Sequence, residues 1–249
     1  MKYSFISDLH INDSDDESAL ILERFINHEK VSDSNVVVFL GDIFDLLIGE
    51  HDPYTQKYSL FFKSIAGFIA DGKEVVFVEG NHDFHFEKTI KKYLLTQVQN
   101  HQNFHYLREG KILNLNGNKY YYCHGYEVDY YNIHFRRWFK IYTSSIFNFL
   151  ISKVLTYSLI QRLGAWASQN SKKRGKKTFN YEQMRAKYLE GAKELIREKK
   201  VKGVIAGHTH VEEFWTFPDG SIYLNCGFPA KHKHFIHYNG TEFEKVIVS

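Results

Sequence analysis

The segment Glu74-Val75-Val76-Phe77-Val78-Glu79-Gly80-Asn81-His82-Asp83 combines an apolar run with a polar cluster at its end. Its first half is rich in β-branched and aromatic residues, as expected of a buried strand, and Gly80 marks the end of that strand. Asn81 and His82 follow at once, so they lie at the carboxyl end of the strand, where α/β proteins bind their ligands. The same pattern is therefore worth seeking in the rest of the chain.

Four other short apolar runs end in the same way. These runs are Tyr3 to Ile6, Val36 to Leu40, Tyr120 to Cys123 and Gly203 to Ala206. The residues that follow them are Asp8-Leu9-His10, Gly41-Asp42-Ile43-Phe44-Asp45, His124-Gly125 and Gly207-His208-Thr209-His210. Taken singly, each cluster is more often a turn or an ordinary surface residue than a ligand. Five such clusters at strand ends instead favour one shared site.

Helix-length segments separate the first three runs. Their apolar residues recur at helical spacing, at Leu20, Leu22, Phe25 and Ile26, and then at Phe61, Phe62, Ile65, Phe68 and Ile69. Alternation of strand and helix predicts an α/β fold with parallel strand pairing and helices on the faces of the sheet. Because ligands bind beyond the carboxyl ends of such strands, clusters far apart in the sequence can meet.

The composition excludes several classes of protein. The chain has 249 residues, of which 43% are hydrophobic and 24% charged, which excludes a disordered or collagen-like chain. Its two cysteines, Cys123 and Cys226, are too few for a secreted disulfide scaffold and suit a reducing compartment. A net charge of +3 gives no argument for a nucleic-acid partner. Met1 leads directly into a strand-like stretch, so we expect no signal peptide.

The clusters together supply seven candidate metal ligands. They are Asp8, His10, Asp42, Asn81, His124, His208 and His210. Seven donors would overfill one tetrahedral ion but suit two octahedral ions that share a carboxylate, and these donor types suit Mn²⁺, Fe²⁺ or Zn²⁺. Two such ions can hold a bridging hydroxide as the nucleophile and bind phosphoryl oxygens. We therefore expect a dinuclear site that hydrolyses a phosphate ester or anhydride.

Two further residues are candidates for catalysis. His82 sits beside a proposed ligand without being needed as one, so its imidazole is placed to act as a general acid or as a hydrogen-bond donor to the substrate. Asp45 follows Asp42 by three residues and is a candidate to orient His82 or a ligand histidine.

The five clusters resemble, in order and over nearly the whole chain, the sequence blocks of the calcineurin-like metallophosphoesterases. This resemblance implies a two-sheet β-sandwich flanked by helices and usually loaded with manganese. It implies one metal held by Asp8, His10, Asp42 and His210 and another held by Asp42, Asn81, His124 and His208, with Asp42 as the bridge. The late strand candidates Phe214 to Phe217, Ser221 to Asn225, His234 to Tyr238 and Phe243 to Val248 would fit its second sheet.

The segment between His124 and Gly203 is longer than a strand connection needs, and Tyr130 to Trp166 is rich in apolar and aromatic residues. We expect one domain over residues 1–249 with a helical insert, or lid, at residues 126–180. Lys153 and Arg162 interrupt the most apolar part, which argues against a transmembrane helix. The insert can be a helical hairpin packed on the sheet, a dimer surface, or a lid that holds acyl chains and touches a membrane.

The insert resembles the lid of one branch of the family, the UDP-2,3-diacylglucosamine hydrolases of lipid A synthesis. The resemblance rests on Asn170-Ser171-Lys172-Lys173 with the basic run to Lys177, on Ile48-Gly49-Glu50-His51-Asp52-Pro53, and on Phe84. Those enzymes cleave the pyrophosphate of UDP-2,3-diacylglucosamine into UMP and 2,3-diacylglucosamine 1-phosphate. The chain departs from the well-studied members at His82, where they carry Arg, although histidine is the wider phosphoesterase pattern and occurs in some bacterial relatives. It departs from them also at Tyr126, where they carry Asp.

The resemblance implies an acylated sugar-nucleotide substrate and a cytoplasmic enzyme in peripheral contact with the inner membrane, of unknown oligomeric state. The substrate contacts that it implies are Asn81, His82, Asp129, Ser171, Lys177 and His208. The alternative is a metallophosphodiesterase of another substrate, either a nucleotide or a phospholipid head group. A non-catalytic scaffold is disfavoured because every ligand position carries a suitable donor.

Overall fold

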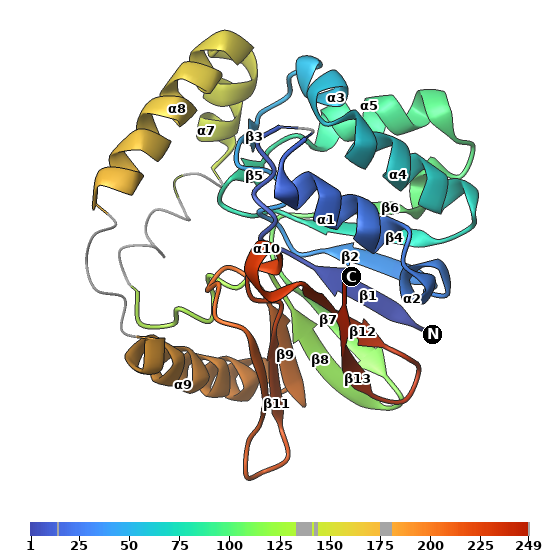
Figure 1. Cartoon of the computed structure of the whole chain (residues 1–249), viewed down its shortest axis with the longest axis vertical. Helices are drawn as coiled ribbons and strands as arrows, with labels where there is room; N and C mark the ends of the chain where they lie inside the picture. The colour runs from blue at the N-terminus through green and yellow to red at the C-terminus, as the bar shows by residue number, and fades with distance from the viewer. Residues whose placement is uncertain (14, 133–140, 142–143, 175–180, 249) are drawn as a thin grey trace.

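The computed structural model describes residues 1–13, 15–132, 141, 144–174 and 181–248. Its strands form two main sheets and a two-stranded ribbon (Figure 1). The first sheet has the order β13-β12-β1-β2-β4-β6, with bounds Phe243–Ile247, His234–Tyr238, Tyr3–Ile6, Val36–Phe39, Glu74–Val78 and Phe104–Leu107. The second has the order β10-β11-β9-β8-β7, with bounds Glu213–Thr216, Ile222–Asn225, Gly203–Ala206, Asn118–Tyr122 and Lys111–Leu115. The ribbon pairs β3 (Leu47–Ile48) with β5 (Asp83–Phe84).

The centre of the first sheet is parallel, as predicted. β1 pairs with β2, β2 with β4, and β4 with β6, all in the parallel sense. Alternate side chains of these strands face two different cores: Phe39 and Phe77 pack toward the helices, whereas Val38 and Val76 pack toward the second sheet. Burial on both faces explains why the runs are continuously apolar rather than alternating.

Helices cover both outer faces of the sandwich (Figure 1). On the first sheet lie α1 (Glu17–Ile26), α2 (Glu29–Ser32), α3 (Pro53–Lys57), α4 (Ser59–Ala70) and α5 (Glu87–Gln97), and the 3₁₀ turn η1 (His101–Asn103) follows α5. On the second sheet, α9 (Tyr181–Lys199) packs Tyr188, Leu195 and Ile196 against Val204. The short α10 (Pro229–His232) precedes β12. The predicted helices at Leu20 to Ile26 and Phe61 to Ile69 are confirmed, and so is the two-sheet α/β class.

The assignment of all four late strands to the second sheet is wrong. β10 and β11 do lie there, but β12 and β13 belong to the first sheet. β12 pairs antiparallel with β1, with Tyr3 opposite Tyr238 and Phe5 opposite Ile236. All five residues of β12 are buried, because Phe235 faces the helical core and Ile236 faces the core between the sheets. The final segment thus completes the open edge of β1.

The expected insert is mostly helical over residues 144–174, whereas residues 126–132 form turns. It contains α7 (Ser145–Phe149), the π-helical turn η2 (Leu150–Val154) and α8 (Tyr157–Arg174), which lie apart from α1, α4 and α5 in Figure 1. Ile151 packs on Phe84, and its carbonyl lies 3.0 Å from His51 Nε2. Of the helices that the structure describes, none combines the length and apolar character that a membrane crossing requires. The limits of the insert at residues 126 and 180 stay a prediction.

Two helical glycines give a matched test of this packing. A Cβ on Gly191 in α9 would lie 2.0 Å from the backbone oxygen of Val128, whereas a Cβ on Gly67 in α4 would meet nothing within 4 Å. We expect Gly191→Ala to lower the free energy of unfolding by roughly 1–3 kcal/mol because the backbone must move. We expect Gly67→Ala to raise it by up to about 1 kcal/mol through helix propensity. Urea unfolding measures both, and a stable Gly191→Ala protein would contradict the close contact.

Candidate metal centre

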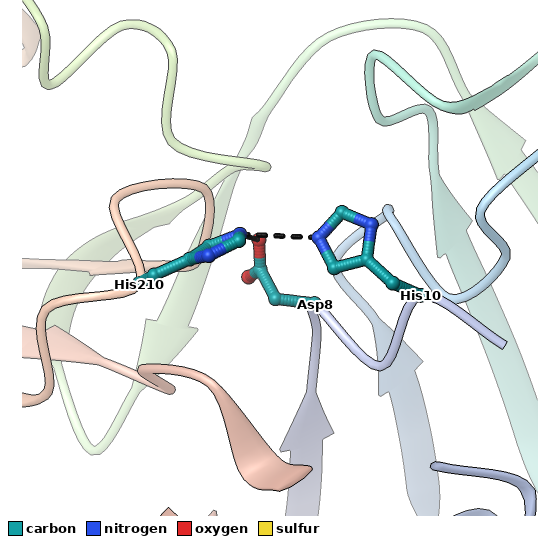
Figure 2. Close-up of side chains that lie close together, drawn as sticks. All are labelled: Asp8, His10 and His210. Carbon is teal, nitrogen blue, oxygen red and sulfur yellow. Dashed lines mark hydrogen bonds and ion pairs between the residues drawn. The ribbon is translucent and has the colours of Figure 1, made fainter. Parts of the chain in front are cut away.

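The strand ends bring two groups of donors together at one edge of the sandwich. Asp8, His10 and His210 form the first group, in which His210 Nε2 lies 3.2 Å from Asp8 Oδ1 and 3.1 Å from His10 Nε2. Figure 2 shows these three side chains pointing toward one another, with Asp8 projecting from the end of β1. Residues from opposite ends of the chain thus share one small space.

The second group surrounds His124. Its Nε2 lies 3.2 Å from Asn81 Oδ1, 3.2 Å from His208 Nδ1 and 3.5 Å from Asp42 Oδ2. The two groups meet at Asp42, because the same Oδ2 atom also lies 3.9 Å from His10 Nε2. One carboxylate oxygen therefore faces both groups, as a bridging ligand must.

These separations fit metal coordination. Two ligands that bind one ion at right angles, with bonds of about 2.1 Å, stand roughly 3 Å apart. The Nδ1 atom of His124 lies 2.7 Å from the carbonyl of Leu40, which accepts its proton, so Nε2 is the atom that would bind a metal ion beside Asp42. The seven predicted ligands thus supply oxygen and imidazole donors at suitable spacing.

The electrostatics of the pocket favour a positive charge. Burial opposes ionisation of Asp42, but the adjacent His124 outweighs it and holds the pKa of Asp42 well below its usual range. Burial likewise opposes protonation of His124, yet the Asp42 carboxylate raises the pKa of His124 to about 10. Burial and the charge of His124 lower the pKa of His208 to about 4. A metal cation between Asp42 and His124 would take the place of the proton on the His124 ring.

The backbone that carries the donors is strained. Five of the seven candidate ligands have positive φ values, which lie between 52° and 67° at Asp8, His10, Asp42, His208 and His210. Residues with a side chain adopt this left-handed region at a cost of order 1–3 kcal/mol each, and such residues gather at functional sites. The left-handed backbone of these residues therefore lowers the stability of the fold, and it directs their side chains into one pocket.

Asp83 holds two of the ligand loops in register, and sequence reasoning assigned it no role. Its carboxylate accepts backbone N–H groups from Asp42 (2.8 Å), Ile43 (2.6 Å), Phe44 (3.2 Å) and Gly80 (3.1 Å). Both oxygens of this buried side chain are occupied by backbone N–H groups, so Asp83 serves as an internal acceptor rather than as a ligand. The position of Asp83 directly after Asn81 and His82 in the sequence is the feature from which a role at the site could have been inferred.

His82 stands at the rim of the site. Its Nδ1 lies 2.9 Å from the backbone oxygen of Asp45 and 3.8 Å from the Asp45 carboxylate, and its ring lies 4.8 Å from the ring of His10. The carbonyl accepts the Nδ1 proton, which leaves Nε2 available. His82 is 40% exposed, in contrast with the buried His124. Asp45 thus orients His82 chiefly through its main chain.

Of the three remaining predicted substrate contacts, the structure describes the side chain of Asp129 alone. Asp129 forms an ion pair with Lys187 of α9 (2.5 Å) and accepts a hydrogen bond from Asn132 (2.7 Å). Ser171 belongs to α8, and its side chain is not described. Lys177 lies outside the described residues. Tyr126, where the related hydrolases carry Asp, packs its ring 6.0 Å from the ring of His124 and 6.5 Å from that of His208.

The chain resembles curated bacterial hydrolases in sequence. It is 34% identical over 80 residues to the UDP-2,3-diacylglucosamine hydrolase of Neisseria meningitidis serogroup C, a match that covers 32% of this chain and 33% of the relative. The chain thus spans about a third of the length of that relative. The protein of the same name from Actinobacillus succinogenes is 23% identical over 221 residues, 87% of each chain.

Solved structures share the fold. An archaeal phosphodiesterase superposes over 99% of both chains with a TM-score of 0.50 at 14% identity, which supports the architecture alone. The model of the calcineurin-like phosphoesterase family matches residues 1–212. That match includes the five clusters up to His210 and confirms the resemblance seen in their order. The chain belongs to the calcineurin-like phosphoesterase family.

Proposed function

We propose that this protein hydrolyses the pyrophosphate of UDP-2,3-diacylglucosamine to UMP and 2,3-diacylglucosamine 1-phosphate. The observation that carries the reaction class is the Asp42 Oδ2 atom, which faces both donor groups at 3.5 Å and 3.9 Å. Members of this family use a dinuclear divalent metal centre, and the grouped Asp and His side chains suit one. The substrate rests on the relatives named for it, from Neisseria to Actinobacillus.

The seven donors would hold two divalent ions, and we propose Mn²⁺, with Fe²⁺ or Zn²⁺ as substitutes. When bound, such ions supply an activated nucleophile and neutralise charge on the phosphoryl oxygens. Asn81 and His208, at the open side of the second donor group, would bind the phosphoryl group as well as metal. Ser171 and Lys177 would contact the sugar phosphate from the insert, and Asp129 would act through its ion pair with Lys187.

His82 would act on the leaving group. Because its Nδ1 proton is held by the carbonyl of Asp45, a protonated His82 presents its second proton at Nε2. The half-exposed rim position allows that proton to pass to the departing phosphate oxygen. The related hydrolases carry Arg here, so His82 would combine charge stabilisation with proton transfer.

The insert would place the enzyme at its lipid substrate. Its helices expose large apolar side chains that a soluble surface normally hides, at Ile146, Phe149, Val154, Leu163 and Trp166. We propose that this face holds acyl chains and makes peripheral contact with the cytoplasmic side of the inner membrane. The alternative is a metallophosphodiesterase that acts on a nucleotide or a phospholipid head group.

The substrate is tested by incubating the manganese-loaded protein with UDP-2,3-diacylglucosamine. We expect release of UMP, quantified by chromatography, at a rate well above that with bis-p-nitrophenyl phosphate or cyclic nucleotides. Robust hydrolysis of the small diesters without UMP release would favour the alternative substrate class and retain the metal centre.

Asp42→Ala tests the bridge between the donor groups. Removal of the shared carboxylate leaves two half-sites, so we expect turnover to be abolished and metal content to fall while the far-ultraviolet circular dichroism is kept. Asp71→Ala, at an exposed position after α4, is the matched control. Metal is measured by mass spectrometry after gel filtration. Near-normal activity in Asp42→Ala would exclude the bridging role.

His82→Ala separates proton transfer from metal binding. We expect turnover to fall by about 10²–10⁴-fold, the usual contribution of a positioned acid, with metal content unchanged. His101→Ala, an exposed histidine of η1, provides the control. Loss of metal along with activity would make His82 a ligand rather than a proton donor.

Membrane contact is tested by changing exposed apolar residues. Ile146 and Phe149 on α7 are 75% and 61% exposed, and Leu95 on α5 is 60% exposed. We expect the double substitution Ile146→Ser with Phe149→Ser to reduce co-flotation with phosphatidylglycerol vesicles, because less apolar surface is available for burial. Leu95→Ser should leave flotation unchanged. Equal flotation of all three proteins would exclude contact through α7.

A further inference from the structure

A small apolar cavity lies behind the loops that carry the donors. It has a volume of about 50 Å³, and its walls come from the loop residues Ile11 and Phe44 and from α1 and α4. Ile11 follows His10 directly, and Phe44 lies between Asp42 and Asp45. The two loops therefore present donors on one side and apolar side chains on the other.

Hydrogen bonds join these loops into one layer between the cavity and the metal centre. Ile11 N donates to Ile43 O (2.9 Å), Asp45 N donates to Ile11 O (3.0 Å), and His10 N donates to Asp42 O (3.0 Å). Ile11 and Phe44 also form a parallel bridge. Whatever fills the cavity therefore touches the backs of both ligand loops.

The shape and lining of the cavity select its occupant. Cavities of about 150 Å³ hold a benzene ring, so about 50 Å³ suits a slim chain rather than a ring. Ala19, Leu22 and Phe61 line it and offer water few polar partners. Phe44 packs against Tyr58 with ring centroids 4.1 Å apart, which makes the wall largely aromatic.

One cation stands at this cavity. Lys57, the last residue of α3, is among the lining residues and is half-buried. Its Nζ lies 5.0 Å from the centre of the Tyr58 ring, and it forms no ion pair with any residue that the structure describes. An unneutralised ammonium beside an apolar cavity matches an anionic head on an aliphatic tail.

We propose that this cavity binds the end of a single aliphatic chain with a carboxylate head at Lys57, and that its occupancy favours the metal-binding arrangement of the two loops. The proposal goes beyond the proposed function: chain binding at the cavity is independent of it, and the coupling to the loops rests on the metal centre proposed there. The cavity lies between α1 and α4, whereas the insert packs on Phe84 through Ile151. Free fatty acids belong to the chemical class that this cavity would take.

The test is a nuclear magnetic resonance titration of the full-length, zinc-loaded protein with butanoate, hexanoate and octanoate. Methyl signals of Ile11 and Ala19 report on the cavity directly. We expect both signals to shift with all three ligands, because a cavity of about 50 Å³ is filled by the end of the shortest chain. Shifts confined to the insert, or no shift at Ile11 and Ala19, would overturn the proposal.

Variants identify the two parts of the ligand. Ala19→Leu fills the cavity, so we expect it to weaken octanoate binding at least tenfold, monitored at Ile11. Lys57→Gln should weaken octanoate but not octanol, whereas Lys63→Gln, an exposed lysine of α4 outside the cavity, should change neither. If Ala19→Leu does not fold, the comparison of Lys57→Gln with Lys63→Gln still tests the proposal. Equal octanoate affinity in Lys57→Gln and Lys63→Gln would overturn the assignment.

The coupling to the loops is read from reciprocal binding. If occupancy favours the metal-binding arrangement, octanoate must bind more tightly to the zinc-loaded protein than to the metal-free protein, by the same factor with which octanoate tightens zinc. We expect a several-fold difference, measured by the same titration. Identical affinities in the two forms would overturn the coupling.

Discussion

The carboxylate of Asp83 is the interaction on which the metal centre depends. It accepts four backbone N–H groups, three of them from the loop after β2 and one from Gly80 after β4. In this way a single buried carboxyl group joins the carboxyl ends of two neighbouring strands. These four hydrogen bonds fix the position of Asp42, which links the two donor groups.

The hydrogen bonds of Asp83 also offset the backbone strain in the loops that carry the candidate ligands. Asp42 adopts a left-handed backbone conformation, as do Asp8, His10, His208 and His210. Isolated loops would relax out of this region, because each such residue costs free energy. Hydrogen bonds that hold the loop backbone, including those from His208 N to Asp8 (2.8 and 3.0 Å), keep the side chains directed inward. Bound cations would compensate the remaining cost by pairing the clustered carboxylates.

The same loops have a second, apolar side. Ile11 and Phe44 stand among the donors in the sequence, but their side chains line the cavity against α1 and α4. Packing behind the metal centre is thus continuous with the helical core of the first sheet. The small cavity thus lies against the same two loops that carry His10 and Asp42.

The strands β1, β4 and β9, the helices between the early strands and the candidate donors that follow the strands could be predicted from the order of residues alone. These features are local: a continuous apolar run ended by glycine or a polar residue can be recognised without knowledge of its spatial neighbours. The folded arrangement was needed to show that β12 and β13 join the first sheet, that Asp83 is an internal acceptor, and that Lys187 pairs with Asp129. Each of these depends on contacts between segments distant in the chain. Packing and burial select such contacts, and the local order of residues does not encode them.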